Sequence, residues 1–353
     1  MWKSRKEKST VEKNLEDTKG TLYILGNGFD CFHGLDTSPD KFLEILKNED
    51  IYNETETAEI VFKRYNVLWG DYESCLADID LEQIADDQMI APDYLSDHEY
   101  DRDSGIFNME QYTESLRGAV QNSLEVMVDN ANNELEVKTP LLCDFVKDND
   151  AVLSFNYTST LERLYDIPRG VPICHIHGFR ENGEPLLLGF RKGITEDEYY
   201  NRVFGRETIE RVQKQIEEIQ NDDILSENKK EQELLYWYSI YDEVTRDRDY
   251  YIDTQYEVVF GFYQSLKKEV QIDKLKKFLK GCGKIERVVV MGHSMSSVDS
   301  DYMELIENVL SPSEWRISQY KDNPSWESLR GYSFGEKVVF YDLADEFQSK
   351  AIK

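Results

Sequence analysis

Four of the five histidines lie in or beside short loops that follow apolar runs, and this placement is the clearest chemical signal in the sequence. These four are His33, His175, His177 and His293. Imidazole titrates near neutral pH, so such a side chain can exchange protons or polarise a ribose hydroxyl. The other interpretation is a histidine that bonds a backbone carbonyl and only holds its loop. That interpretation is favoured for His175, which alternates within its run, whereas a functional role is favoured for His177, which stands at the run's end.

The apolar runs that precede these loops have the length and composition of buried strands. They are Thr21–Leu25, Val152–Phe155, Ile173–Ile176 and Val288–Met291, and two later runs, Trp315–Ile317 and Val338–Tyr341, extend the series. Strands buried on both faces are typical of a mostly parallel sheet flanked by helices. Ligands of such sheets bind beyond the carboxyl ends of the strands, so we expect the four loops to converge on one cleft. The predicted fold class is therefore α/β and Rossmann-like.

The first loop, Gly26-Asn27-Gly28-Phe29-Asp30, combines two glycines with an acid. Glycine allows backbone N–H groups to approach a phosphate or ribose closely at the start of a helix. A complete dinucleotide fingerprint would have a third glycine at position 31, which is Cys31, so the loop alone is a weak signal.

Two further loops carry polar groups. Asn156 is followed by the hydroxyls of Tyr157, Thr158, Ser159 and Thr160, and the asparagine can position a water or a ribose hydroxyl or simply cap a helix. The loop from Gly292 through His293 and Ser294 to Asp299 has a Gly-x-Ser start. The glycine that a nucleophile elbow needs at position 296 is a serine, so these groups fit phosphate or ribose contacts better than a serine hydrolase.

A metal site is an alternative use of the same histidines. His175 and His177 form a His-x-His pair, and Asp30 or Asp299 could supply a third ligand from another loop. No carboxylate adjacent in the sequence completes the pair, so we expect no metal.

Composition narrows the classes of partner. Acidic residues outnumber basic ones 70 to 41 and give a net charge of −29, which makes nucleic acid or an anionic membrane an unfavourable partner. No apolar run is long enough to span a bilayer, and the five cysteines form no C-x-x-C pair. We expect a cytoplasmic protein without disulfides or a zinc knuckle.

The chain divides into three expected parts. Residues 1–20 are a charged extension that lacks apolar periodicity, and residues 21–198 with 282–353 form the nucleotide-binding core, including a helical segment at 40–148. Within that segment, residues 86–105 are expected to be an acidic surface loop whose Asp101–Gly105 stretch only faintly matches a calcium loop. Residues 199–281 form a helical insertion that can serve as a lid, an oligomer contact or a partner surface.

Taken together, these motifs resemble the AbiH family of bacterial phage abortive-infection proteins. The likeness rests on I-L-G-N-G-F-D from Ile24 with H-G-L from His33, F-N-Y-T with L-E-x-L-Y from Phe155, I-H-G from Ile176, and G-H-S from Gly292 with Asp299. The segment Trp69–Leu76 also looks like the family's W-x-x-x-E-x-x-L element.

The order of the loops is similar, more distantly, to the SIR2-like NAD-binding fold. That resemblance implies NAD as substrate or ligand, with Asn156 orienting water or ribose and His177 as general base. The residues expected to bind the nucleotide are Gly26, Asn27, Gly28, Phe29, Asp30, His33, Thr158, Gly178, Gly292, His293, Ser294 and Asp299. Asn27 and Thr158 replace residues usual in that fold, and the four-cysteine zinc module of sirtuin deacylases is absent, so a protein deacylase is not expected.

The resemblances together imply an abortive-infection effector that hydrolyses NAD or a related nucleotide at the N-glycosidic bond. Two other classes stay open: a nucleotide sensor that signals to a partner without turnover, and a metal-dependent nuclease or phosphoesterase. The expected partners are the nucleotide and either a phage trigger or a second copy of the chain bound through the helical insertion.

Overall fold

The computed structural model describes residues 19–50, 76–222, 225–245, 249–295, 297–319, 329 and 331–343. The expected extension at 1–18 and all but the last residue of the Trp69–Leu76 element lie outside these residues. The chain forms two compact units, each built from separate segments. Unit 1 comprises residues 1–35, 134–177 and 271–353, and unit 2 comprises residues 36–133 and 178–270. The boundaries therefore differ from the expected ones, because the helical segment after residue 35 groups with the later helices.

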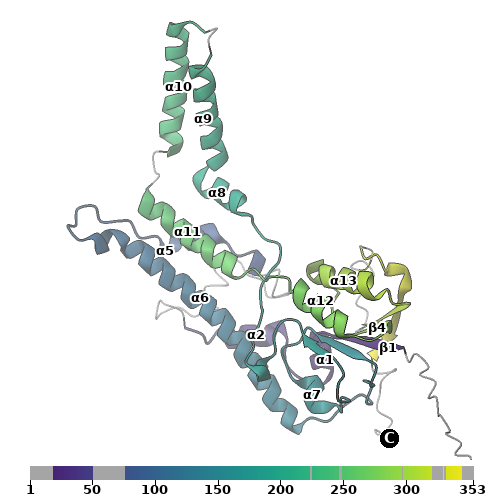
Figure 1. Cartoon of the computed structure of the whole chain (residues 1–353). Coiled ribbons are helices and arrows are strands. Elements are labelled where there is room, and N and C mark those ends of the chain that lie inside the picture. Colours follow the sequence, from purple (N-terminus) through teal and green to yellow (C-terminus); the bar gives the residue numbers. More distant parts are fainter. Residues whose placement is uncertain are drawn as a thin grey trace, which may run out of the picture. The chain divides into compact units, whose positions relative to one another are not determined.

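Unit 1 contains a six-stranded sheet in which every neighbouring pair of strands is parallel. Its strands are β1 (Gly20–Leu25), β2 (Ala151–Ser154), β3 (Ile173–His175), β4 (Ile285–Met291), β5 (Glu314–Gln319) and β6 (Val338–Asp342). Their spatial order is β3-β2-β1-β4-β5-β6. This is the order of a doubly wound Rossmann-like sheet, in which the direction of winding reverses between β1 and β4. The predicted α/β Rossmann-like fold class is confirmed, and β1 and β4 lie next to each other in Figure 1.

The sheet is buried because its central strands are almost wholly apolar. Leu22 and Ile24 of β1 and Val288 and Val290 of β4 have no exposed surface. Such continuous apolar runs are expected only where helices cover both faces of a parallel sheet. The helices of unit 1 are α1 (Asn27–Phe32), α7 (Thr160–Leu164), α12 (Ile272–Gly281) and α13 (Ser300–Leu310), with short 3₁₀ turns η1 (Leu135–Val137), η3 (Ser297–Asp299) and η4 (Gly335–Lys337).

Unit 2 is helical in its described residues. Its helices are α2 (Pro39–Leu46), α5 (Leu81–Gln88), α6 (Glu99–Glu134), α8 (Glu196–Phe204), α9 (Arg206–Gln220), α10 (Glu227–Thr245) and α11 (Tyr250–Ser265), with the turn η2 (Arg180–Asn182). Helices α9 and α10 run side by side as a hairpin (Figure 1). These two helices lie in the segment 199–281, where helices were expected.

One expectation about unit 2 is wrong: the stretch Asp101–Gly105 lies inside α6 rather than in an acidic loop. Acidic residues suit the first turns of a helix because they face its partial positive charge. Gly105 is accommodated because the helix passes close to a neighbouring segment, and a Cβ there would lie 2.6 Å from the Ile90 carbonyl oxygen. The glycine is therefore a packing requirement and not a turn signal.

Candidate functional site

The register of the sheet places the four predicted loops side by side along one edge of the sheet in unit 1. These loops and the side chains that they carry are called the row below. Leu25 of β1 is paired with Ser154 of β2 and with Met291 of β4, and Ser154 is paired with His175 of β3. The residues that follow these four therefore leave the sheet at the same level. This register and the contacts described next bring the four loops together at one edge of the sheet.

Asp30, on α1, is the buried acid at the centre of the row. Its side chain is 2% exposed, and its two carboxylate oxygens accept hydrogen bonds from the Thr160 hydroxyl at 2.6 Å and the Thr158 hydroxyl at 2.7 Å. Burial raises the pKa of Asp30 to about 6, although these two hydroxyls and the side chain of Asn156 oppose the rise. The acid thus titrates near neutral pH.

Asn156 ties the first loop to the second. Its side-chain amide nitrogen donates to the Gly26 carbonyl oxygen at 3.1 Å, and its backbone N–H donates to the Ser154 hydroxyl at 3.2 Å. The residue is 6% exposed. The amide of Asn156 therefore fixes the backbone of the glycine loop.

His175 lies between two hydrogen-bond acceptors. Its Nδ1 is 3.2 Å from the Asn156 carbonyl oxygen, and its Nε2 is 2.8 Å from Glu162 Oε1. A backbone carbonyl can only accept, so Nδ1 must carry a proton. The favoured loop-holding interpretation of this histidine fits its bond to Asn156, but its ion pair with Glu162 adds a charged group that the sequence pattern did not indicate.

His33 is a core histidine. Its Nδ1 donates to the Phe29 carbonyl oxygen at 2.7 Å, so its Nε2 accepts from the Tyr165 hydroxyl at 2.6 Å. The imidazole also packs against the rings of Phe29 and Tyr165. Burial lowers the pKa of His33. This predicted nucleotide contact is therefore neutral and occupied by protein atoms in this structure.

His177 and His293 both contact the ring of Phe155. The centroid of the Phe155 ring is 5.1 Å from that of His177 and 4.4 Å from that of His293, and both contacts are edge-on. The Tyr302 ring lies 5.6 Å from Phe155 and 6.1 Å from His177. The Phe155 ring therefore links the ends of β2, β3 and β4.

His293 is held in a defined tautomer. The backbone N–H of Met295 donates to His293 Nδ1 at 3.0 Å, which leaves the proton of the neutral ring on Nε2. That nitrogen is 3.3 Å from Asp299 Oδ2. Asp299 therefore orients His293.

The glycines of the first loop make room for the fourth loop. Gly26 N–H donates to the Met291 carbonyl oxygen at 3.0 Å and Gly28 N–H to the Gly292 carbonyl oxygen at 2.8 Å. A Cβ on Gly28 would lie 2.8 Å from Gly292 Cα, and a Cβ on Gly26 would lie 2.6 Å from His293 Cα. In this structure Gly26 and Gly28 therefore allow the backbone of the first loop to pack directly against the backbone of the fourth loop.

The predicted residues differ in their access to solvent. Asp30, Asn156, Thr158 and His177 are buried, with exposed fractions between 2% and 6%. Asn27 and Ser294 are exposed, and Gly28 and Gly292 are half-buried. Asn27 and Ser294, which we call the rim of the row, thus face solvent, whereas its buried polar residues are shielded from solvent.

Gly178 stands apart because it belongs to unit 2. Its φ is +96°, a conformation that favours glycine, and a Cβ there would lie 2.2 Å from the Pro185 carbonyl oxygen. This close approach within unit 2 and the positive φ explain why position 178 is a glycine.

Sequence reasoning missed two polar members of the row, Thr160 and Glu162. Both follow Asn156 within six residues, and Thr160 was noted only as one of several hydroxyls. The signal was the i, i+2 spacing of Thr158 and Thr160, because both hydroxyls reach the same carboxylate.

The described residues contain no group of three or more His, Cys, Asp or Glu side chains arranged to hold a metal ion. The His-x-His pair is split in its contacts, since the His175 ring bonds to Asn156 and Glu162 whereas the His177 ring packs against aromatic side chains. Within the same residues, no helix has the length and apolar character needed to cross a membrane.

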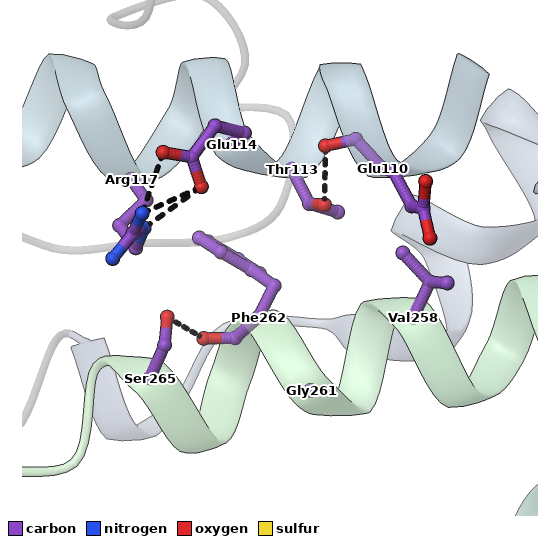
Figure 2. A pocket seen from close by; sticks show the side chains of 8 residues that line it. All are labelled: Glu110, Thr113, Glu114, Arg117, Val258, Gly261, Phe262 and Ser265. Carbon is purple, nitrogen blue, oxygen red and sulfur yellow. Dashed lines mark hydrogen bonds and ion pairs between the residues drawn. The ribbon is translucent and has the colours of Figure 1, made fainter. Parts of the chain in front are cut away.

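A separate groove of about 270 Å³ lies between α6 and α11 in unit 2 (Figure 2). Its polar groups are bonded within their own helices. Arg117 is paired with Glu114, the Thr113 hydroxyl donates to the Glu110 carbonyl oxygen at 3.1 Å, and the Ser265 hydroxyl donates to that of Phe262 at 2.6 Å. None of the predicted site residues lines this groove.

The sheet order and the polar row at its carboxyl edge define a Rossmann-like α/β protein. A family model described as bacteriophage abortive infection AbiH matches residues 22–319. The chain therefore belongs to the AbiH family, and its role is in abortive-infection defence against bacteriophage. No curated protein sequence and no solved structure matches the chain.

Proposed function

We propose that this AbiH protein binds NAD or a related nucleotide at the carboxyl edge of the unit 1 sheet and hydrolyses its N-glycosidic bond. Loss of the cofactor then arrests the infected host. The reversal of winding between β1 and β4 supports this location, because doubly wound sheets bind their ligands where the strand order reverses.

The observation that carries the proposal is the buried network of Asp30 and Asn156 at this point. A carboxyl group with a pKa near 6, enclosed by two hydroxyls and next to an amide, is the kind of perturbed group that marks functional sites. Activity measurements on variants of this row are the decisive test.

The reaction breaks the bond between ribose C1′ and the nicotinamide nitrogen and forms a bond from C1′ to a water oxygen. Nicotinamide leaves with the electron pair of the broken bond and becomes neutral. Asn156 orients the water, and the His177 imidazole takes its proton. Asn27 and Ser294, the exposed residues of the rim, contact the phosphates or ribose. Because His177 is 5% exposed, the substrate reaches it only after the rim opens.

The test is to incubate the purified full chain with NAD and to follow nicotinamide and ADP-ribose by chromatography. His177→Ala is expected to lower release by at least about 100-fold, the usual contribution of a positioned base. The matched control is His98→Ala, since His98 is an exposed histidine of unit 2. Asn156→Ala is assayed together with its thermal unfolding, because its amide also holds Gly26. Nicotinamide release that persists at full rate in both site variants refutes the proposal.

A second candidate function is nucleotide sensing without turnover. It is favoured by the loop contacts, because the N–H groups of Gly26 and Gly28, which a phosphate would use, already bond to the end of β4 and to the start of the fourth loop. A nucleotide would then separate the two loops, and the helices at residues 199–281 would pass that change to a phage component or to a second copy. Calorimetric binding of NAD without any release of nicotinamide would favour this function.

A further inference from the structure

We infer that Glu162 contacts the substrate in this site and accepts a hydrogen bond from a ribose hydroxyl, the 2′-hydroxyl beside the bond that breaks. Glu162 was not among the predicted site residues. The inference rests on the proposed function, since it assigns a further residue to the same site.

The side chain of Glu162 is hydrogen-bonded at one oxygen, and the other oxygen is buried without a donor among the described residues. Oε1 lies 2.8 Å from His175 Nε2, and the side chains of Glu162 and His175 are 25% and 8% exposed. Oε2 is buried, and none of the described residues donates a hydrogen bond to it. A buried carboxylate oxygen without a donor is costly, so a ligand hydroxyl that reaches it gains more than a hydroxyl on an already satisfied group.

His175 Nε2 and Glu162 Oε1 also share one proton, which either of the two groups can carry. Nδ1 of His175 donates to the Asn156 carbonyl oxygen, so the second ring nitrogen faces a carboxylate across 2.8 Å with one proton between them. When the proton is on His175, Glu162 is a full carboxylate with a free acceptor oxygen. His175 is therefore a positioning residue that orients Glu162 toward its ligand.

Three other titratable groups of the row already have partners for their polar atoms. Both oxygens of Asp30 accept threonine hydroxyls, and both ring nitrogens of His33 are bonded. His293 accepts at Nδ1 and faces Asp299 at Nε2. Glu162 thus offers what these three do not, an acceptor oxygen to which no described residue donates.

A carboxylate at the 2′-hydroxyl would act on the chemistry as well as on binding. Positive charge develops at C1′ as nicotinamide leaves, and a hydrogen bond from the adjacent hydroxyl to a carboxylate strengthens as that charge grows. No bond to Glu162 forms or breaks, and the proton of the hydroxyl stays on the ribose. Oε2 is covered in the present structure, so the opening of the rim that admits the nucleotide must also uncover it.

The test is a cycle that pairs Glu162→Gln with NAD and its 2′-deoxy analogue, measured as kcat/KM for nicotinamide release. Glu162→Gln is expected to lower the value for NAD by about 10- to 100-fold, the range for a hydrogen bond to a charged group, and to change the value for the 2′-deoxy analogue less than about threefold. His175→Gln is expected to reduce the same preference for NAD. Asp166→Asn, an exposed carboxylate-to-amide change in unit 1, is the matched control.

The outcomes separate the two proposals. An equal loss with both substrates means that Glu162 acts only through the fold, and this overturns the inference while the proposed function stands. A wild-type chain that binds NAD without turnover is tested by the same cycle on dissociation constants from calorimetry. A wild-type chain that neither binds nor cleaves NAD refutes both. If Glu162→Gln does not fold, Glu162→Asp replaces it, because a shortened carboxylate must still lower the preference for NAD over the 2′-deoxy analogue.

Discussion

Replacing Asp30 with asparagine should remove a pH dependence of stability that the buried acid imposes. Burial raises the pKa of Asp30 from 3.8 to about 6 in the folded chain. A folded protein that binds a proton more tightly than its unfolded chain is most stable when that proton is bound. The contribution is therefore fully present below pH 3.8 and is lost as the pH rises through about 6.

The magnitude follows from the same two values. A separation of about two pKa units between the folded and unfolded states corresponds to about 3 kcal/mol of unfolding free energy. The introduced amide would stay neutral at every pH, and it can still exchange hydrogen bonds with Thr158 and Thr160. The stability of Asp30→Asn relative to the wild type should thus increase by about 2.4 kcal/mol between about pH 4 and pH 7, because part of the full difference is reached only below pH 4.

The assay is urea-induced unfolding of both proteins at intervals of pH from about 4 to 8, with Asp166→Asn as the exposed control. The comparison uses the difference between the two unfolding free energies, which cancels the titration of the other acids. A difference that stays constant over this range, or that falls as the pH rises, would refute the argument from burial.

Two further predictions concern the packing of unit 1. Gly292→Ala should destabilise the chain by more than about 2 kcal/mol in urea unfolding, because φ is +68° and the added Cβ would lie 2.2 Å from the Phe29 nitrogen. The control is Gly183→Ala, which has a φ of +67° with no atom within 4 Å of the added Cβ, and an equal loss in both variants would contradict the role of the contact. Tyr165→Phe should cost about 1–3 kcal/mol by thermal or urea unfolding, because it removes the hydroxyl that donates to His33 Nε2 at 2.6 Å. Unchanged stability would show that His33 is satisfied in another way.

The strands could be predicted from the sequence because burial on both faces makes each one a short apolar run. Val288 to Met291, for example, has no polar residue and lies wholly inside β4. The order of the strands could not be predicted in the same way. The apolar sequence of β1 does not indicate which strands lie beside it. Its partners β2 and β4 are determined by the packing of the whole unit.

The acidic stretch at Asp101–Gly105 shows a different limit. Asp and Gly are frequent in loops, but they also suit a helix start and a close helix contact, and only the neighbouring Ile90 and Gln255 decide between these uses. Local composition therefore predicted a loop where a tertiary contact requires a helix.

The site was predicted at the level of its loops and less well at the level of its contacts. Asp30, Asn156 and His177 could be chosen as candidates from the sequence because each closely follows an apolar run. Glu162 was missed because it lies on α7, well beyond its strand, and only the fold brings it to His175. A residue whose side-chain partner lies on another strand has no short-range signal in the sequence.

The pairing of β1 with β4 also sets when the site can exist during synthesis. Residue 25 of β1 leaves the ribosome 260 residues before residue 285, where β4 begins, since 285 minus 25 is 260. At roughly 5–20 residues per second this interval is about 13–52 s, during which the glycine loop has no fourth loop to bond. The nascent chain would therefore carry no complete set of loops until most of it has been translated, and a chain truncated before β4 would never form one.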